Sequence, residues 1–125
     1  MSDNKTVLIV DDEQDIVETL RFMLEAEGIN CLTANDGEEA LNKAKTEMPD
    51  LIILDVMLPK INGYKVSRLL KFDRKYKDIP ILMVTARSQD EDKVIGQDTG
   101  ADEYITKPFD LNNVIDLVKK YLNMQ

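Results

Sequence analysis

The sequence predicts an α/β fold in which short strands alternate with helices. Five short runs favour strand, and segments with apolar residues at helical spacing lie between most of them. Turn-forming residues separate the runs, and no stretch is left over for a linker or a second domain. Strict alternation of this kind predicts a parallel sheet with right-handed crossovers and helices on both faces. We therefore expect residues 1–125 to form a single domain.

The first part of the chain predicts two strand–helix units. Residues 7–10 form a short apolar run rich in β-branched side chains, and residues 14–27 carry their apolar side chains on one helical face. Gly28 ends this helix in the manner of a C′ glycine. Residues 30–34 predict a weaker strand, and the short helix that follows it cannot continue past Pro49.

The run Leu-Ile-Ile-Leu-Asp at residues 51–55 is the centre of the predicted sheet. Four large apolar residues lie between turn signals, which indicates a strand buried on both faces. Asp55 stands at the carboxyl end of this strand. Ligands of open parallel sheets bind at that edge, so Asp55 is the first candidate for a functional residue.

The second part of the chain continues the alternation. A helix is predicted from Asn62 and Gly63, with Val66, Leu69 and Leu70 expected to face the sheet.

Two strands and two helices complete the predicted fold. Strand 81–84 is followed by an acidic segment, 88–98, whose weak amphipathic pattern predicts a helix. Strand 103–106 comes next. Apolar residues at helical spacing over 111–122 predict a final amphipathic helix.

The composition restricts the classes of function. The chain has a formal net charge of −8, which argues against direct binding to nucleic acid because such binding needs clustered Lys and Arg. Its one cysteine, Cys31, cannot form an internal disulfide and lies among apolar residues, which indicates a packing role in a reducing compartment. No targeting segment or run of membrane-spanning length is present, so we expect a cytoplasmic protein without membrane contact.

Polar residues follow four of the five predicted strands: Asp11, Asp12, Asp55, Thr85 and Lys107. In a doubly wound sheet of strand order 2-1-3-4-5 these residues meet at one edge. Singly, each has an ordinary explanation as a cap, turn or loop residue. Together, three carboxylates that repel one another are explained by a hard dication among them, and Mg²⁺ is the natural one. The ammonium and the hydroxyl would then contact a phosphoryl group.

Four ordered motifs cover nearly the whole chain. They are Val-Asp-Asp-Glu at 10–13, Leu-Asp-Val-Met-Leu-Pro at 54–59, Val-Thr-Ala at 84–86 and Gly-Ala-Asp-Glu-Tyr-Ile-Thr-Lys-Pro-Phe at 100–109. With these motifs the chain resembles the CheY-like receiver domains of two-component response regulators. The resemblance implies a flavodoxin-like fold of five βα units.

The resemblance also implies a role for each residue of the predicted edge. Asp55 would be the phosphoacceptor, Lys107 would pair with the phosphoryl group, and Thr85 and Tyr104 would form a switch pair. The implied ligands of Mg²⁺, for which Mn²⁺ can substitute, are Asp11, Asp12, Asp55 and the backbone carbonyl of Met57. The Lys107–Pro108 peptide bond is expected to be cis.

The function implied by the resemblance is that of a phosphorylation switch. A sensor histidine kinase or a histidine phosphotransfer protein would donate the phosphoryl group, since this chain has no histidine of its own. The face formed by the fourth helix, the fifth strand and the fifth helix would signal to a downstream protein. The chain would catalyse only its own phosphorylation and a slow self-dephosphorylation, tuned by Met57 and Arg87.

Alternative functions remain open from the sequence. A Mg²⁺-dependent phosphatase with an aspartyl nucleophile typically has a second acid two residues after it, where this chain has Met57. A nucleotide or flavin carrier is disfavoured because the chain contains neither GxxxxGK[ST] nor GxGxxG. A receiver without phosphorylation chemistry is disfavoured because all of the expected site residues are present.

The end of the chain bears on its expected organisation. The sequence stops at Gln125, directly after the last helix, and Asn113 and Leu117 replace the Glu and Arg that pair across dimers in winged-helix regulators. We therefore expect a stand-alone receiver, with a fragment of a larger DNA-binding regulator as the alternative.

Overall fold

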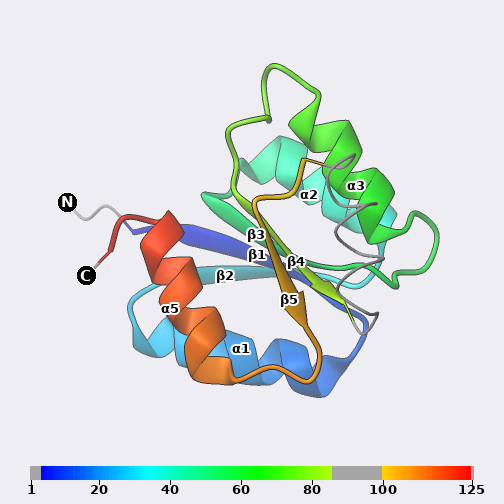
Figure 1. Cartoon of the computed structure of the whole chain (residues 1–125). Coiled ribbons are helices and arrows are strands. Elements are labelled where there is room, and N and C mark those ends of the chain that lie inside the picture. The colour runs from blue at the N-terminus through cyan, green and yellow to red at the C-terminus, as the bar shows by residue number, and fades with distance from the viewer. Residues whose placement is uncertain (1–3, 86–99, 125) are drawn as a thin grey trace.

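The computed structural model describes residues 4–85 and 100–124 (Figure 1). Within them, five parallel strands form one sheet of order β2-β1-β3-β4-β5, as the sequence predicts. The strands are β1 (Thr6–Val10), β2 (Asn30–Ala34), β3 (Leu51–Asp55), β4 (Ile81–Thr85) and β5 (Glu103–Thr106). The helices are α1 (Gln14–Ala26), α2 (Gly37–Glu47), α3 (Gly63–Lys71) and α5 (Leu111–Tyr121). The helix predicted at 88–98 lies outside the described residues.

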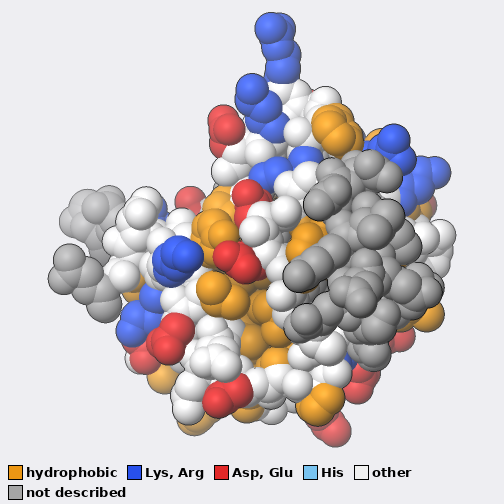
Figure 2. Space-filling view, viewed as in Figure 1, with side chains coloured by type: hydrophobic (Ala, Val, Ile, Leu, Met, Phe, Trp, Pro, Cys, Tyr) orange, Lys and Arg blue, Asp and Glu red, His pale blue; other side chains and the backbone are white. Residues whose placement is uncertain are grey.

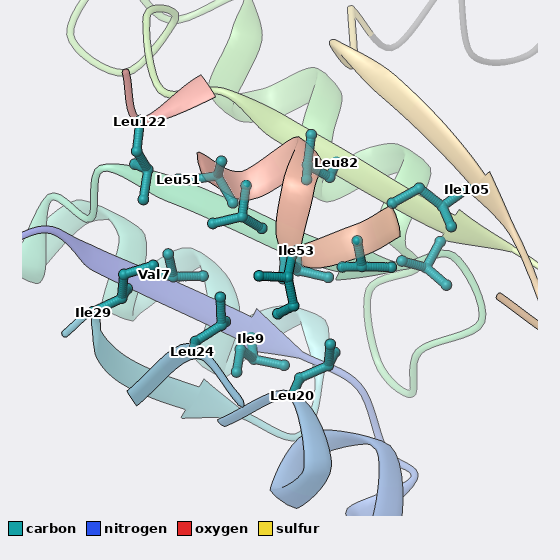
Figure 3. Close-up of a cluster of buried hydrophobic side chains, with 14 of the residues drawn as sticks. Val7, Ile9, Leu20, Leu24, Ile29, Leu51, Ile53, Leu82, Ile105 and Leu122 are labelled. Carbon is teal, nitrogen blue, oxygen red and sulfur yellow. The ribbon is translucent and has the colours of Figure 1, made fainter. Parts of the chain in front are cut away.

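The helices pack on the two faces of the sheet and bury two separate hydrophobic clusters (Figure 1). One cluster joins α1 and α5 to the sheet, with Leu51 and Ile53 among its members (Figure 3). The other joins α2 and α3 to the opposite face, with Ile52 and Leu54 among its members. Successive residues of β3 thus point into different clusters, because side chains alternate along a strand. All five residues of β3 are buried, as the sequence predicts.

Local signals fix the ends of the helices. The Asp36 carboxylate accepts a hydrogen bond from the Glu39 backbone N–H at 2.8 Å, and the Asn62 side chain accepts one from the Lys65 N–H at 3.0 Å. Both are N-cap bonds, which satisfy backbone donors that the first turn of a helix leaves unpaired. Gly28 has a φ of 81° after the end of α1, the left-handed conformation expected of a C′ glycine.

The buried face of α3 differs from the prediction at one position. Leu69 is 45% exposed, so the expectation that it faces the sheet is wrong. The buried residues are Gly63, Val66, Ser67 and Leu70, at the i, i+3, i+4 and i+7 spacing of one helical face. Ser67 therefore takes the inner position that hydrophobicity alone assigned to Leu69.

The single cysteine has the packing role that its apolar context predicts. Cys31 is partly buried in β2 and packs against the cluster beneath α1 and α5. Burial, together with the nearby charge of Glu25, raises the pKa of its thiol to about 11. A thiol with so high a pKa is mostly unreactive at neutral pH, because the thiolate is the nucleophile.

The acidic balance of the chain is not uniform over its surface. Six of the sixteen Lys and Arg residues lie between residues 65 and 77, a segment that contains one acidic residue, Asp73. Figure 2 shows basic side chains projecting at the top of the view, where Figure 1 places the connection from α3 to β4. The net charge of −8 therefore does not describe this side of the molecule.

A glycine docks the start of α3 against the strand end that bears Asp55. The Gly63 N–H donates a hydrogen bond to the Val56 carbonyl at 2.9 Å. A Cβ at residue 63 would clash with the Asp55 carbonyl oxygen and would lie 2.9 Å from the Val56 Cα. The close approach of the helix to the strand end thus requires a residue without a side chain.

We predict that Gly63→Ala destabilises the fold by about 1–3 kcal/mol, the usual range for overpacking against backbone that cannot retreat. Helix propensity alone would make Gly63→Ala more stable than the wild type, because Ala within a helix is more favourable than Gly by about 0.5–1 kcal/mol. Urea unfolding of the wild type and the variant measures the difference. Lys65→Ala, at an exposed position of the same helix, serves as control and should change stability by less than about 0.5 kcal/mol. Equal or higher stability for Gly63→Ala would contradict the predicted clash.

Candidate functional site

The site lies at the carboxyl edge of the sheet, where the sequence predicts it. Asp11 and Asp12 directly follow β1, Asp55 ends β3, and Lys107 follows β5. Asp11 and Asp55 are each only 4% exposed, while Asp12 is exposed to solvent. The side chains come together because β1 and β3 are neighbours in the sheet, with Val10 opposite Leu54.

The three carboxylates form a compact cluster. One oxygen from each of Asp11, Asp12 and Asp55 lies within 4.8 Å of the others. Two of these groups are buried, so water screens their mutual repulsion poorly. The cluster is therefore electrostatically unfavourable when all three groups are ionised and nothing positive is near.

The pKa values of both buried carboxyls are raised, mainly by burial. Burial, and then the charge of Asp11, raise the pKa of Asp55 to about 6, against the lowering effects of Lys107 and of the Met57 N–H. Burial likewise raises the pKa of Asp11, although a hydrogen bond from the Glu13 N–H and the charge of Lys107 oppose the rise. Both carboxyls thus bind protons more tightly than in an unfolded chain.

Lys107 supplies positive charge at the edge of the cluster. Its Nζ lies 2.7 Å from a Glu13 carboxylate oxygen, 3.2 Å from one of Asp11 and 3.7 Å from one of Asp55. Burial favours the neutral amine, but these three acids outweigh it and raise the pKa of Lys107. The ammonium form is therefore held firmly beside the carboxylates.

Glu13 is a part of the site that the sequence prediction did not include. It occurs in the Val-Asp-Asp-Glu motif, in which the resemblance implies roles for the two aspartates only. Its contact with Lys107 joins residues 94 positions apart in the chain. The position of Glu13 directly after two predicted metal ligands favours a role in the site. It is also ordinary for a helix start, because acidic residues are common there.

Backbone contacts hold the site residues in place. The Glu13 N–H donates to Asp11 at 2.9 Å, and the Met57 N–H donates to Asp55 at 3.3 Å. The Lys107 N–H donates to the Thr85 carbonyl at 2.7 Å, which ties the end of β4 to the loop after β5. The Lys107–Pro108 peptide bond is cis, as expected.

The two residues of the predicted switch pair lie on adjacent strands. Thr85 is buried at the end of β4. Tyr104 is half-buried on β5, opposite Met83, and packs against the cluster beneath α2 and α3. Arg87 lies outside the described residues. The Met57 side chain is exposed, and its backbone carbonyl as a metal ligand stays a prediction.

The donor atoms fit the metal that the sequence predicts. Carboxylate oxygens are the ligands that Mg²⁺ prefers, and one or two of them typically hold the ion while it keeps several waters. A buried pair beside an exposed third carboxylate could offer this arrangement and leave room for a phosphoryl oxygen. The cluster could therefore hold a divalent cation of the Mg²⁺ class.

The comparisons with known proteins identify the family of the chain. The model of the response regulator receiver domain family matches residues 7–119. The chain belongs to this family. Its site residues thus occur in a receiver domain, and the receiver fold is shared by the structures described below.

Relatives include transcriptional regulators about twice as long as this chain. The alkaline phosphatase synthesis transcriptional regulatory protein PhoP of Bacillus subtilis is 51% identical over 119 residues, which cover 95% of this chain and 49% of that protein. The phosphate regulon transcriptional regulatory protein PhoB of Klebsiella pneumoniae is 43% identical over 92% of this chain and 50% of its own length. The chain therefore spans about half the length of these curated relatives.

Solved structures of similar length share the fold. A response regulator from Chloroflexus aurantiacus has a TM-score of 0.89 at 37% identity and covers 96% of this chain and 98% of its own. The chemotaxis response regulator CheY4 of Vibrio cholerae has a TM-score of 0.87 at 33% identity, over 94% of this chain and 98% of its own. Within residues 4–85 and 100–124, no helix has the length and apolar character needed to cross a bilayer.

We predict that Asp55→Asn raises the free energy of unfolding of the metal-free protein by about 1–3 kcal/mol at pH 7.5. The folded state raises the pKa of Asp55 to about 6. Above the pKa that Asp55 has in the unfolded chain, ionisation of this carboxyl therefore lowers the free energy of unfolding. The side-chain amide of Asp55→Asn does not ionise, so the variant avoids this loss. The gain should be full above pH 6 and should fade as the pH drops toward 4. Urea unfolding across this pH range, in the presence of a chelator, measures it.

Asp116→Asn is the matched control, because Asp116 is exposed on α5 away from the cluster. It should change stability by less than about 0.5 kcal/mol at either pH. Added Mg²⁺ should stabilise the wild type more than Asp55→Asn, since a ligand that binds only the folded state shifts the equilibrium. A gain from Asp55→Asn that is unchanged between pH 7.5 and pH 4 would contradict a raised pKa.

Proposed function

We propose that this chain is a phosphorylation switch that accepts a phosphoryl group on Asp55. The observation that carries the proposal is the buried Asp55 carboxylate, which lies with two other carboxylates and 3.7 Å from the Lys107 ammonium. The family supports it, since the chain is a response regulator receiver domain. The chain would act only on itself, through its own phosphorylation and a slow self-dephosphorylation, and not on a pool of substrate.

The chemistry we propose is an in-line transfer between two anions. A carboxylate oxygen of Asp55 attacks phosphorus, the bond from phosphorus to a histidine nitrogen of the donor breaks, and the freed imidazole retains the bonding electron pair. Bound Mg²⁺ would supply charge that stabilises the equatorial phosphoryl oxygens. Lys107 contributes a second positive charge from the protein. Asp11 and Asp12 are the proposed metal ligands, together with Asp55 and the Met57 carbonyl.

The donor we propose is a phosphohistidine on a sensor kinase or a phosphotransfer protein. The chain contains no histidine and so cannot carry the donor group itself. A groove of about 570 Å³ opens between the start of α1 and the loop before α5, and its lining includes Ile16, Phe109 and Leu111 next to Lys107. An apolar groove beside the acceptor is a suitable surface for part of a donor protein.

The output we propose is a change at β5 and α5. A phosphoryl group on Asp55 adds oxygens that the Thr85 hydroxyl can reach, and inward movement of Thr85 would make room for Tyr104 to become fully buried. The half-buried position of Tyr104 beside β4 supports this coupling. The predicted fourth helix, which would complete the output face, lies outside the described residues.

The organisation of the whole protein belongs to the proposal as well. We propose that residues 1–125 form one domain that itself makes no contact with nucleic acid. Because PhoP and PhoB are transcriptional regulators twice as long, a second candidate is that this chain is the receiver part of such a regulator. On α5, Asn113 is exposed and Leu117 packs against the hydrophobic cluster beneath α1 and α5, so neither offers the charges with which Glu and Arg pair across dimers of winged-helix regulators.

We predict that acetyl phosphate or phosphoramidate with Mg²⁺ adds the mass of one phosphoryl group to the wild type, and that Asp55→Ala gains none. Intact mass spectrometry measures both. Asp116→Asn, which removes a carboxylate elsewhere, should be modified like the wild type. An unmodified wild type, or a modified Asp55→Ala, would refute the assignment of Asp55 as acceptor.

We also predict that the aspartyl phosphate is long-lived and that Met57→Asn with Arg87→Glu hydrolyses it roughly tenfold faster, a modest share of what orienting a water contributes. The exposed Met57 side chain is apolar and cannot orient an attacking water. A phosphate-release assay on purified phosphoprotein gives the two rates. Met57→Leu keeps the position apolar and should keep the slow rate. A double variant that hydrolyses the aspartyl phosphate no faster than the wild type would contradict this role of Met57 and Arg87.

A further inference from the structure

Lys107 is closer to Glu13 than to the proposed phosphoacceptor. The Lys107 Nζ lies 2.7 Å from Oε1 of Glu13 and 3.7 Å from Oδ2 of Asp55. The Glu13 contact is also shorter than the one to Asp11, at 3.2 Å. In the unphosphorylated protein the ammonium is therefore held toward the α1 side of the site, and the residue that holds it most closely has no proposed role in metal binding.

The Glu13 carboxylate does not cap the helix that follows it. Glu13 is the N-cap residue of α1, but its side chain makes no capping hydrogen bond. Its backbone N–H is fixed by the bond to Asp11 at 2.9 Å. The backbone is thus anchored to the site, while the carboxylate reaches Lys107.

The pair lies at the mouth of the site. The Glu13 side chain is 58% exposed and that of Lys107 is 15% exposed. Both residues line the groove between α1 and the loop before α5. A phosphoryl group arriving at Asp55 would compete with Glu13 for the same ammonium, because the Coulomb attraction of each anion depends on its distance from Nζ.

We propose that Glu13 is a positioning residue that draws Lys107 toward the mouth of the site and so slows phosphoryl transfer to Asp55. This inference rests on the proposed function. Lys107 must lengthen its contact with Glu13 to approach a phosphoryl oxygen. The transfer rate is therefore set in part by the Glu13–Lys107 pair. An exposed ion pair typically changes an equilibrium constant by roughly 1.5- to 5-fold, and we expect the effect of the Glu13–Lys107 pair on the transfer rate to lie within this range.

The first test asks whether the pair exists in the metal-free protein. Urea unfolding of wild type, Glu13→Gln, Lys107→Met and the double variant, with a chelator present, forms a double-mutant cycle. We expect a favourable coupling of about 1.5- to 5-fold in the unfolding equilibrium constant. A coupling factor of one would overturn the proposal before any phosphorylation is measured.

The second test measures phosphorylation by phosphoramidate at saturating Mg²⁺. We expect Glu13→Gln to be phosphorylated about 2- to 5-fold faster than the wild type. Asp15→Asn is the matched control, because Asp15 lines the same groove and the variant loses the same charge, whereas the described acids that pair with Lys107 are Asp11, Glu13 and Asp55. The apparent Mg²⁺ affinity of the two variants should be the same.

The Lys107→Met background separates positioning from general charge. There, the changes Glu13→Gln and Asp15→Asn should have equal effects on the rate. A Glu13→Gln rate equal to that of Asp15→Asn in the wild-type background would overturn the proposal. So would a lower rate with weaker Mg²⁺ binding, which would make Glu13 part of the metal site. A wild type that is not phosphorylated at all would instead refute the proposed function, so the two failures are distinguishable.

Discussion

The site depends on a charge imbalance that the fold maintains. Asp11 and Asp55 are buried side by side at the ends of adjacent strands, with Asp12 close to both. The single charge of Lys107 does not offset three carboxylates, and this ammonium also contacts Glu13. Burial raises the pKa of Asp55, and the charge of Asp11 adds to the rise. A site in this condition gains free energy from any additional positive charge, which gives it a physical reason to bind a hard dication.

The rigid part of the molecule is what sustains this imbalance. All residues of β3 are buried between two hydrophobic clusters, so Asp55 cannot move out to solvent without exposing apolar side chains. Gly63 presses the start of α3 against the same strand end. The residues proposed to move are Thr85 and Tyr104. They lie on β4 and β5, which continue the sheet from β3 on the side away from β1. The structure thus holds Asp55 fixed, and the two residues proposed to respond to it lie on the next two strands of the sheet.

Much of the fold and site follows from the sequence because topology brings strand ends together. Parallel strands in the order β2-β1-β3-β4-β5 bring Asp11, Asp55 and Lys107 to one edge, whatever the loops between them do. The prediction that Leu69 is buried, which rests on hydrophobicity, is wrong. The position of a residue around the helix decides whether it faces the sheet, and Ser67 lies on the buried face of α3. Glu13 could not be assigned, because its contact depends on where the long Lys107 side chain points.

The fold holds Asp55 buried in a site where the negative charge of the carboxylates exceeds the positive charge of Lys107. A carbon-13 NMR titration of the Asp55 carboxyl in the metal-free protein tests this most directly. We expect an apparent pKa of about 6, which falls once Mg²⁺ is added, because the ion favours the carboxylate. An Asp55 carboxyl that titrates at its ordinary value of 3.8 without metal, and does not respond to Mg²⁺, would contradict the account.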